Sequence, residues 1–595
     1  MTDNHEKARA IFLTVVMVVS MVGSGIAFSG GAAAQTADII VDADGDGDYT
    51  LIQEAVDNAG DTDRIVVEPG IYDESVAISK NITLVAPNGA RITNSSQVTN
   101  RYGISIDGPV NATVSGFTLT DWQWGVSAGG SEADWTLRNT TMSNISETAI
   151  GGGGTPGDWT ATNVSVFDSE TGVSADFSTG NWSVVDSTFD NVNEVVFADR
   201  TTGNWSITST RIKHSREDAI TVDQSTSNWT VSDTSIYDIN GQGIDTTNAG
   251  GSGIIENTSI SHTSSDAVDV GDSSIDVLIS NVSVYNSSTY GIEAGNSSGE
   301  IVIESSVINE TADHGIELEK STSNWNITDS EIRNSAASGI DAYKAENTGN
   351  ISNVTVDSVE ENGINLYNAT GTWSITDSKI TNTNLSSVNA GETTGQWNIN
   401  RTVFSDGTTA VDAINSTYEG DAAYNYWGAS DGPSGDFNGS GGAAVGNLTV
   451  SPAYTDSTLS TLTVVSNESG PVVDATASSA TPTIASSGES QEYRVNVTIA
   501  LNESLSDSSG GVDVQFEDFV FDTGEDDLTI DYTPANISNG TLNVTETVNA
   551  TAPSTAGEYA VNVTDLRREN SDGSVDNIIQ NSNITISNIT VLKTT

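Results

Sequence analysis

The stretch Trp229-Thr-Val-Ser-Asp-Thr-Ser-Ile-Tyr-Asp-Ile-Asn-Gly-Gln-Gly-Ile244 is one unit of a repeat that occupies most of the chain. Its last two residues, a small residue and then a branched apolar one, return every 23 or 24 residues. A short fixed period indicates a solenoid, in which each unit buries its apolar face by stacking on its neighbours. The pairs are Gly125-Val126, Ala149-Ile150, Gly172-Val173, Val195-Val196, Ala219-Ile220, Gly243-Ile244, Ala267-Val268, Gly291-Ile292, Gly315-Ile316, Gly339-Ile340, Gly363-Ile364, Ser387-Val388 and Ala410-Val411.

The bulk composition limits the classes of partner. A formal charge of -61 and a pI near 4.1 exclude nucleic acid bound through a basic surface, because phosphates would be repelled. Such a charge resembles that of proteins from extreme halophiles, since at ~1 M salt the Debye length is only about 3 Å. An acidic disordered chain is disfavoured by 36% hydrophobic residues in a strict period. Without cysteine, stability depends on packing and hydrogen bonds.

The N-terminus has the features of a secretory signal. Lys7 and Arg9 precede an apolar run over residues 10–22, and small residues follow up to Ala34. We therefore expect residues 1–34 to be a signal peptide and the mature protein to be secreted or held at the cell surface. No second long apolar stretch follows, so we expect no membrane span after cleavage.

Two motifs after the signal resemble a known family. Asp44-Gly-Asp-Gly-Asp48-Tyr-Thr-Leu-Ile-Gln-Glu-Ala-Val56, followed by Ile65-Val-Val-Glu-Pro-Gly-Ile-Tyr72, resembles the opening of pectin-lyase-like right-handed parallel β-helix proteins. The resemblance implies an all-β solenoid of 23–24 residues per coil, with an N-terminal helix cap and first coils in residues 38–102 and the β-helix in 103–455. Thr50 and Gln53 fit a capping box for the helix. The segment 424–433 resembles the family's closing motif.

The period ends after Ser451-Pro452. Residues 456–490, rich in Ser, Thr and Ala towards their end, are expected to be a linker. Residues 491–595 alternate strands and turns, which is typical of a β-sandwich. The expected strands are Tyr493–Leu501, Val512–Phe521, Leu528–Tyr532, Thr541–Thr547, Glu558–Val563 and Ile584–Val591.

A column of tryptophans recurs one repeat apart. Coils of a solenoid are separated by ~4.8 Å, so residues in register form columns. An apolar residue follows two positions after nearly every Trp, which favours a place in the core over a sugar-stacking platform. The column contains Trp135, Trp159, Trp182, Trp205, Trp229, Trp325, Trp373 and Trp397.

A second column places carboxylates after the branched residue in successive coils. By strand alternation they point outward, and like charges ~4.8 Å apart repel by roughly 1 kcal/mol in water. The column is therefore either a solvated acidic face or a site that binds substrate or cations, with Ca²⁺ the one cofactor that the sequence suggests. Its members are Asp245, Asp269, Glu293, Glu317 and Asp341.

A third column, counted from the period, contains Asp190, His214, Asp238, His262 and Asn286. Lys213 lies beside it, so the candidate catalytic residues are Lys213, His214, Asp238 and His262. A general base and a cation are what cleavage of a polysaccharide requires. The alternative is a ladder of turn residues, because Asn and Asp occupy equivalent positions elsewhere.

Asp42, Asp44 and Asp46 match the first half of an EF-hand loop, but Gln53 stands where that loop needs a bidentate carboxylate. A metal site here competes with a simple acidic turn. Roughly thirty Asn-x-Ser/Thr sequons make the chain a candidate glycoprotein.

We therefore expect a secreted or cell-surface β-helix protein that binds or organises carbohydrate, its partner being a polysaccharide or surface glycan. The alternative is a polysaccharide lyase or glycoside hydrolase acting on an acidic polysaccharide. An accessory role in metal or sugar handling is a third hypothesis.

Overall fold

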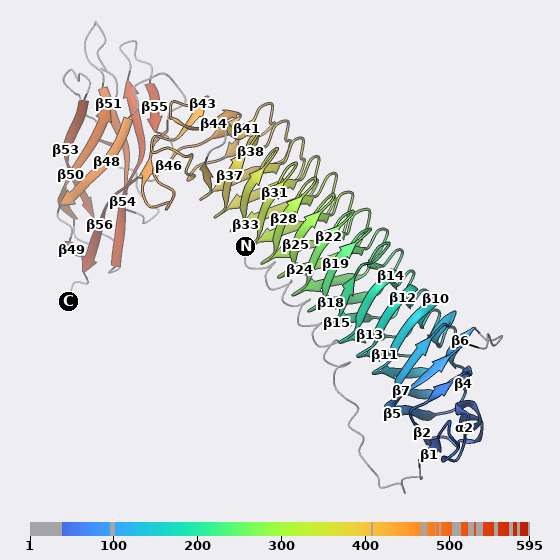
Figure 1. Cartoon of the computed structure of the whole chain (residues 1–595). Coiled ribbons are helices and arrows are strands. Elements are labelled where there is room, and N and C mark those ends of the chain that lie inside the picture. Colours follow the sequence, from blue (N-terminus) through green and yellow to red (C-terminus); the bar gives the residue numbers. More distant parts are fainter. Residues whose placement is uncertain are drawn as a thin grey trace.

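The computed structural model describes residues 38–95, 101–405 and 409–465, and, as backbone, the strands between 473 and 592. The expected signal peptide lies outside the described residues. The described part is all-β apart from one helix, and its strands form a parallel solenoid whose coils stack along one axis (Figure 1). The repeat therefore predicted the fold class, and the all-β solenoid is confirmed.

The helix α2 (Ile52–Asn58) lies at the first end of the solenoid (Figure 1). Its first N–H groups are not capped by Thr50, so the predicted capping box is wrong. Instead, the Glu74 carboxylate accepts the backbone N–H groups of Ile52 at 2.8 Å and Gln53 at 3.0 Å. Burial raises the pKa of Glu74. The first coils contain β1 (Ile39–Val41), β2 (Arg64–Val67), β3 (Ile71–Tyr72), β4 (Val76–Ile78), β5 (Ile82–Thr93), β6 (Tyr102–Ile106) and β7 (Asn111–Thr120).

Each coil contributes strands to three parallel ladders. The tryptophan strands are β9 (Asp134–Arg138), β11 (Trp159–Thr162), β13 (Trp182–Val185), β15 (Trp205–Thr208), β18 (Asn228–Ser232), β21 (Ser252–Glu256), β24 (Asp276–Ser280), β27 (Ile301–Glu304), β30 (Trp325–Thr328), β33 (Thr348–Ser352), β36 (Thr372–Thr376), β39 (Trp397–Asn400), β42 (Gly420–Asp421) and β45 (Leu448–Thr449). The middle strands begin within β10 (Thr141–Gly151), β12 (Ser165–Ser174) and β14 (Thr188–Phe197) and continue as β16 (Arg211–Lys213), β19 (Ser235–Ile239), β22 (Ser259–Thr263), β25 (Ser283–Ser287), β28 (Val307–Thr311), β31 (Glu331–Ser335), β34 (Thr355–Val359), β37 (Lys379–Thr383) and β40 (Val403–Ser405).

The short strands form the third ladder, which β8 (Trp124–Ser127) and the ends of β10, β12 and β14 join. They are β17 (Ile220–Thr221), β20 (Ile244–Asp245), β23 (Val268–Asp269), β26 (Ile292–Glu293), β29 (Ile316–Glu317), β32 (Ile340–Asp341), β35 (Ile364–Asn365), β38 (Ser386–Asn389), β41 (Thr409–Ala413) and β44 (Gly441–Gly446). Their outward side is called the short-strand face below.

The tryptophan column is part of the core. Its indole rings are only 2% to 5% exposed, which confirms the interpretation as packing rather than a sugar platform. From Trp135 to Trp229 the rings stack at 4.9 to 5.4 Å between centroids, with planes within 10°. Where the stack is interrupted, a glycine accepts the preceding ring: a Cβ on Gly253 would lie 2.4 Å from Trp229. Apolar stacking therefore continues along the whole axis.

The corners of each coil use left-handed backbone. Non-glycine residues with positive φ recur at three positions per coil, and Asn and Asp hold many of them. These side chains tolerate that conformation better than most. One corner column, next to the middle strands, contains Asn144, Asp168, Asn191, His214, Asp238, His262, Asn286, Glu310, Asn334, Ser358 and Asn382.

Beyond the solenoid, β43 (Pro433–Gly435) pairs with β44, and β46 (Ala453–Tyr454) pairs with β47 (Leu462–Thr463). Two further sheets contain β48 (Val473–Thr481), β50 (Ser490–Leu501) and β53 (Gly540–Thr551), and then β49 (Ile484–Ser486), β51 (Asp513–Phe521), β52 (Thr529–Ile530), β54 (Gly557–Glu569), β55 (Val575–Ile579) and β56 (Ile584–Leu592). β48 and β49 fall in the range expected to be a linker. Among the described residues, no helix is long and apolar enough to cross a membrane.

Candidate functional site

The predicted carboxylate column lies on the short-strand face in the predicted register. Asp245 pairs with Asp269, Asp269 with Glu293, Glu293 with Glu317, and Glu317 with Asp341. The column continues as Asn365, Asn389 and Asp412. These side chains form one row parallel to the solenoid axis.

The row is less solvated than a freely exposed acidic face. Glu317 and Asp341 are only 5% and 8% exposed, and the other members are half-buried. The alternative of a solvated face is therefore wrong for the last two carboxylates. A second column, three residues earlier in each coil, stands beside the row and contains Gln242, Asp266, Tyr290 and His314.

Each carboxylate of the row uses one oxygen to hold its own turn. The backbone N–H groups of Thr247, Gly271, Gly295, Glu319 and Tyr343 donate to the side chain two residues before, at 2.7 to 3.1 Å. Asn365 and Asn389 do the same, so this role needs an acceptor and not a charge. The second oxygen of the carboxylates remains available for other contacts.

Asp269 and Glu293 are register partners in the row. Glu293 Oε2 is buried and has no hydrogen-bond partner among the described residues. Burial, and then the charge of Asp269, raises the pKa of Glu293 strongly. The pair thus carries less than its formal charge.

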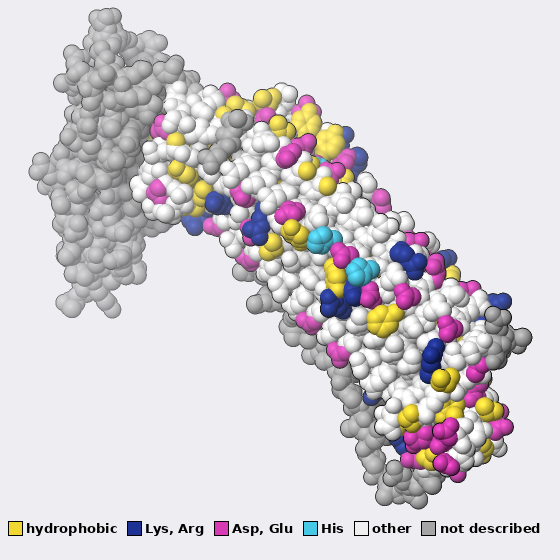
Figure 2. Space-filling model, viewed as in Figure 1, with side chains coloured by type: hydrophobic (Ala, Val, Ile, Leu, Met, Phe, Trp, Pro, Cys, Tyr) yellow, Lys and Arg dark blue, Asp and Glu magenta, His cyan; other side chains and the backbone are white. Residues whose placement is uncertain are grey.

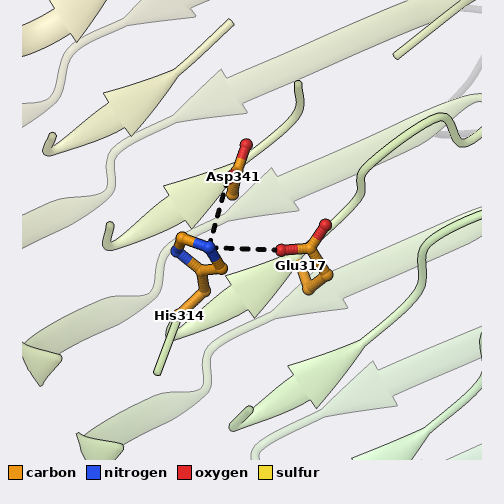
Figure 3. Close-up of side chains that lie close together, drawn as sticks. All are labelled: His314, Glu317 and Asp341. Atoms are coloured by element: carbon orange, nitrogen blue, oxygen red, sulfur yellow. Dashed lines mark ion pairs between the residues drawn. The ribbon is translucent and has the colours of Figure 1, made fainter. Parts of the chain in front are cut away.

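His314 completes a compact cluster with Glu317 and Asp341, in which one ligating atom of each lies within 4.8 Å of the others (Figure 3). Its Nε2 lies 3.2 Å from Asp341 Oδ2 and 3.6 Å from Glu317 Oε2. The exposed Asp313 carboxylate is also 3.6 Å from Nε2. Burial, and then the charge of Asp341, raises the pKa of Glu317 to about 8. This is the only such group of His, Asp and Glu that the described residues contain.

Sequence analysis missed His314. The signal was its column: it occupies the position that Asp266 and Tyr290 hold in the two preceding coils, and Asp266 sits close enough to the row to share Gln242 with Asp269. Any titratable residue in that column is therefore a neighbour of the carboxylates.

The ring of His314 has a fixed orientation. Its Nδ1 accepts the backbone N–H of Ser338 at 2.9 Å, and the ring stacks on Tyr290 with centroids 5.9 Å apart. A neutral imidazole that accepts at Nδ1 carries its proton on Nε2. Metal-bound histidines normally donate from the nitrogen that is not bound, so this arrangement makes His314 a hydrogen-bond donor to the carboxylates and a poor metal ligand.

The second candidate, around His214, lies at the corner beside the middle strands. The predicted register is wrong by one residue at its start, because Asp190 pairs with Lys213 and Asn191 occupies the column position of His214. Asp190 nevertheless reaches diagonally to both neighbours: its carboxylate is 2.7 Å from His214 Nδ1 and 2.8 Å from Lys213 Nζ. Burial works to raise the pKa of Asp190, but these two hydrogen bonds outweigh it and lower the pKa.

Asp238 stands between the two histidines, 3.6 Å from His214 Nε2 and 4.0 Å from His262 Nδ1. Both rings are about half exposed, and Figure 2 shows histidines beside acidic and basic side chains on the surface. The four candidates Lys213, His214, Asp238 and His262 are thus brought together. His214, Asp238 and His262 all have φ between 54° and 57°, so they also serve as corner residues.

Asp42, Asp44 and Asp46 lie in a tight turn after β1. Asp42 Oδ1 accepts the N–H of Asp44 at 2.9 Å, and the Asp42 carbonyl oxygen accepts that of Gly45. This is the hydrogen bonding of an acidic turn. Within the described part of the chain, these three carboxylates do not form a cluster compact enough to hold one metal ion, and a cation here stays a prediction.

Comparison with known proteins supports the fold. A family profile described as "Right handed beta helix region" matches residues 171–318 and 218–380. The matched part is a right-handed β-helix. It contains both candidate sites, from Lys213 to Asp341. No curated protein matches the sequence.

Solved structures resemble this chain distantly. The periplasmic alginate epimerase AlgG shares 12% identity over 70% of this chain and 84% of its own, with a TM-score of 0.29. The pectate lyase Pel9A shares 14% over 49% and 74%, with a TM-score of 0.30. The catalytic domain of a GH87 alpha-1,3-glucanase shares 13% over 56% and 63%, with a TM-score of 0.31. At these values the likenesses carry no argument about activity.

Proposed function

We propose that this protein is secreted or held at the cell surface and binds carbohydrate along its short-strand face. The observation that carries the proposal is the continuous row from Asp245 to Asp341, in which hydrogen-bonding oxygens repeat once per coil along the axis. A linear polymer laid along the axis would meet the same group at each step. Secretion rests on the N-terminal sequence and halophily on the charge.

Aromatic rings flank the row and suit the apolar faces of sugars. Tyr343 and Tyr367 stand two residues after members of the row, half-buried, with their centroids 6.0 Å apart and their planes 19° apart. Tyr290 lies on the other side. Aromatic rings at binding surfaces supply contact area at low entropy cost.

Affinity electrophoresis through gels that contain soluble polysaccharides tests the proposal. The expected result is retardation of the protein, reduced about tenfold in affinity by the double variant Tyr343→Ala and Tyr367→Ala. Tyr285→Ala is the control, because this tyrosine is 41% exposed on a middle strand. If no polysaccharide retards the protein, the proposal fails.

The alternative is cleavage of an acidic polysaccharide by the His214 site, as a lyase or hydrolase. It is favoured by one observation: the Asp190 carboxylate contacts an imidazole and an ammonium group at once, in a setting where basic residues are scarce. Such a cluster offers a base, an acid and a cation for developing charge. New reducing ends or unsaturated products, lost in His262→Asn, would support it.

We further propose roles for the two ends of the chain. At the N-terminal end, α2 would cover the open first coil, which otherwise presents apolar side chains and an unpaired edge. Residues 491–595 would form a sandwich-like domain for attachment, an assignment supported by the antiparallel pairing of β50 with β53 and of β51 with β54. Calorimetric titration with Ca²⁺ tests a cation at the row or at Asp42, Asp44 and Asp46.

A further inference from the structure

The cluster of Glu317, Asp341 and His314 has an excess of acceptors over donors. Glu317 is the decisive residue, because its side chain is only 6% exposed. Its Oε1 accepts the N–H of Glu319 at 2.7 Å, but Oε2 receives no hydrogen bond from the described residues and points at His314 Nε2 from 3.6 Å. Because most of this side chain is shielded from water, a carboxylate oxygen without a donor is costly here.

The chain's own cations do not relieve this excess. No described lysine or arginine forms an ion pair with Glu317 or Asp341; the nearby Lys320 pairs with Glu319, and the Lys344 ammonium group lies 4.6 Å from the centre of the Tyr343 ring. The pKa of Glu317, raised by burial and by the charges of Asp341, Glu319 and Asp313, reports the same shortage of positive charge. The cluster therefore fits a cation from outside.

Two observations decide what kind of cation fits. The proton on His314 Nε2 opposes a metal at that nitrogen, whereas an ammonium group carries three donors and no acceptor, which matches oxygens that lack donors. Tyr290, which stacks on His314, and Tyr343, two residues after Asp341, supply aromatic surface next to the cluster for a carbon ring attached to that ammonium group. The side chains of Asp313 and Glu319 are 44% and 39% exposed, so solvent-accessible carboxylates lie beside the cluster.

We infer that the glycan bound on the short-strand face is an amino-sugar polymer, with an ammonium group held by Glu317 and Asp341. This inference rests on the proposed carbohydrate binding and names its substrate class. Uronic-acid polymers are disfavoured on this face, because the row and its neighbours Asp266 and Asp313 would repel their carboxylates. His314 is a positioning residue that orients Asp341.

Binding of three oligosaccharides to the purified full chain tests the inference: deacetylated chitosan, chitin of equal length, and polygalacturonate. Chitosan should bind at least about tenfold more tightly than chitin, which has the same backbone without the charge, and polygalacturonate should not bind. Glu317→Gln with Asp341→Asn should abolish the preference for chitosan. Glu300→Gln, an exposed charge beside the tryptophan strands, is the control and should leave the preference intact.

The outcomes separate the two ideas. If none of the three binds and no other polysaccharide does, the proposed function itself fails. If chitin binds as well as chitosan, or polygalacturonate binds more tightly, carbohydrate binding stands and the ammonium site is wrong. If Ca²⁺ or Mn²⁺ alone binds, in a manner lost in the Glu317 and Asp341 variant, and displaces chitosan, the cluster is a metal site and the inference is overturned.

Discussion

Gly349 lies against the indole ring of Trp325, its register partner in the preceding coil of the tryptophan ladder. A Cβ built on Gly349 would come within 2.0 Å of Trp325 Cζ2. Glycine at this position is therefore required by the size of its neighbour. In this column, the size of one residue limits the size of its register partner in the next coil.

Replacement of Gly349 by Ala should destabilise the solenoid by about 2 kcal/mol, because the ring cannot move without disturbing a packed core. Chemical denaturation monitored by circular dichroism measures the loss. Gly129→Ala is the matched control, since its nearest atom would be 3.5 Å away. Equal stability of the two variants would contradict the packing argument.

Substitution of His214 separates its two possible roles. As a corner residue with φ of 54°, it should be replaced by Asn at little cost and by Ala at about 1 kcal/mol, because Asn tolerates this conformation and Ala does not. If the site is catalytic, both variants lose activity. Unchanged turnover of an acidic polysaccharide in His214→Asn would remove the residue from the chemistry.

Glu194 should make stability depend on pH. Burial, and then the charges of Glu217 and Asp218, raises its pKa from 4.5 to about 7. A carboxyl group with a raised folded pKa stabilises fully below pH 4.5 and loses that contribution as the pH rises through about 7. We expect a loss on the order of 2 kcal/mol between pH 5 and 8, after allowance for solvent screening.

Denaturant midpoints of the wild type and Glu194→Gln over this pH range provide the check. The variant should show a smaller fall in stability, because its amide does not titrate. Parallel curves for the two proteins would show that Glu194 titrates near its ordinary pKa.

Lowering the salt concentration should unfold the protein. A formal charge of -61 repels itself more strongly as the Debye length grows, and we expect the β signal in circular dichroism to fall below ~0.5 M salt. Sucrose at equal osmolality is the control, because it does not screen charge. A folded spectrum in dilute buffer would contradict the proposed halophily.

The repeat made most of the fold predictable because every coil places the same position in the same surroundings. Trp205 pairs with Trp229, and Asp245 with Asp269, as counting along the sequence predicts. Counting failed at Asp190, where one coil is a residue shorter and the register moves to Asn191. Counting therefore assigns residues to a column correctly only where the number of residues per coil is constant.

The site was less predictable than the fold, since side chains meet across columns. The contact of His314 with Asp341 joins different positions of successive coils, and no periodic count reveals it. The acceptor for the first N–H groups of α2 was missed for the same reason: the Glu74 carboxylate comes from the segment between β3 and β4, 22 residues later than Ile52. Burial of Glu317 depends on these neighbours and not on strand alternation.

The stacked indoles from Trp135 to Trp229 have an optical consequence. Nearly parallel rings about 5 Å apart have coupled electronic transitions, so light absorbed by one ring is shared along the row. This part of the solenoid should therefore show an ultraviolet absorption band that is displaced from the band of isolated indoles. The displacement depends on the spacing between coils, so it reports the separation of neighbouring coils without an added label.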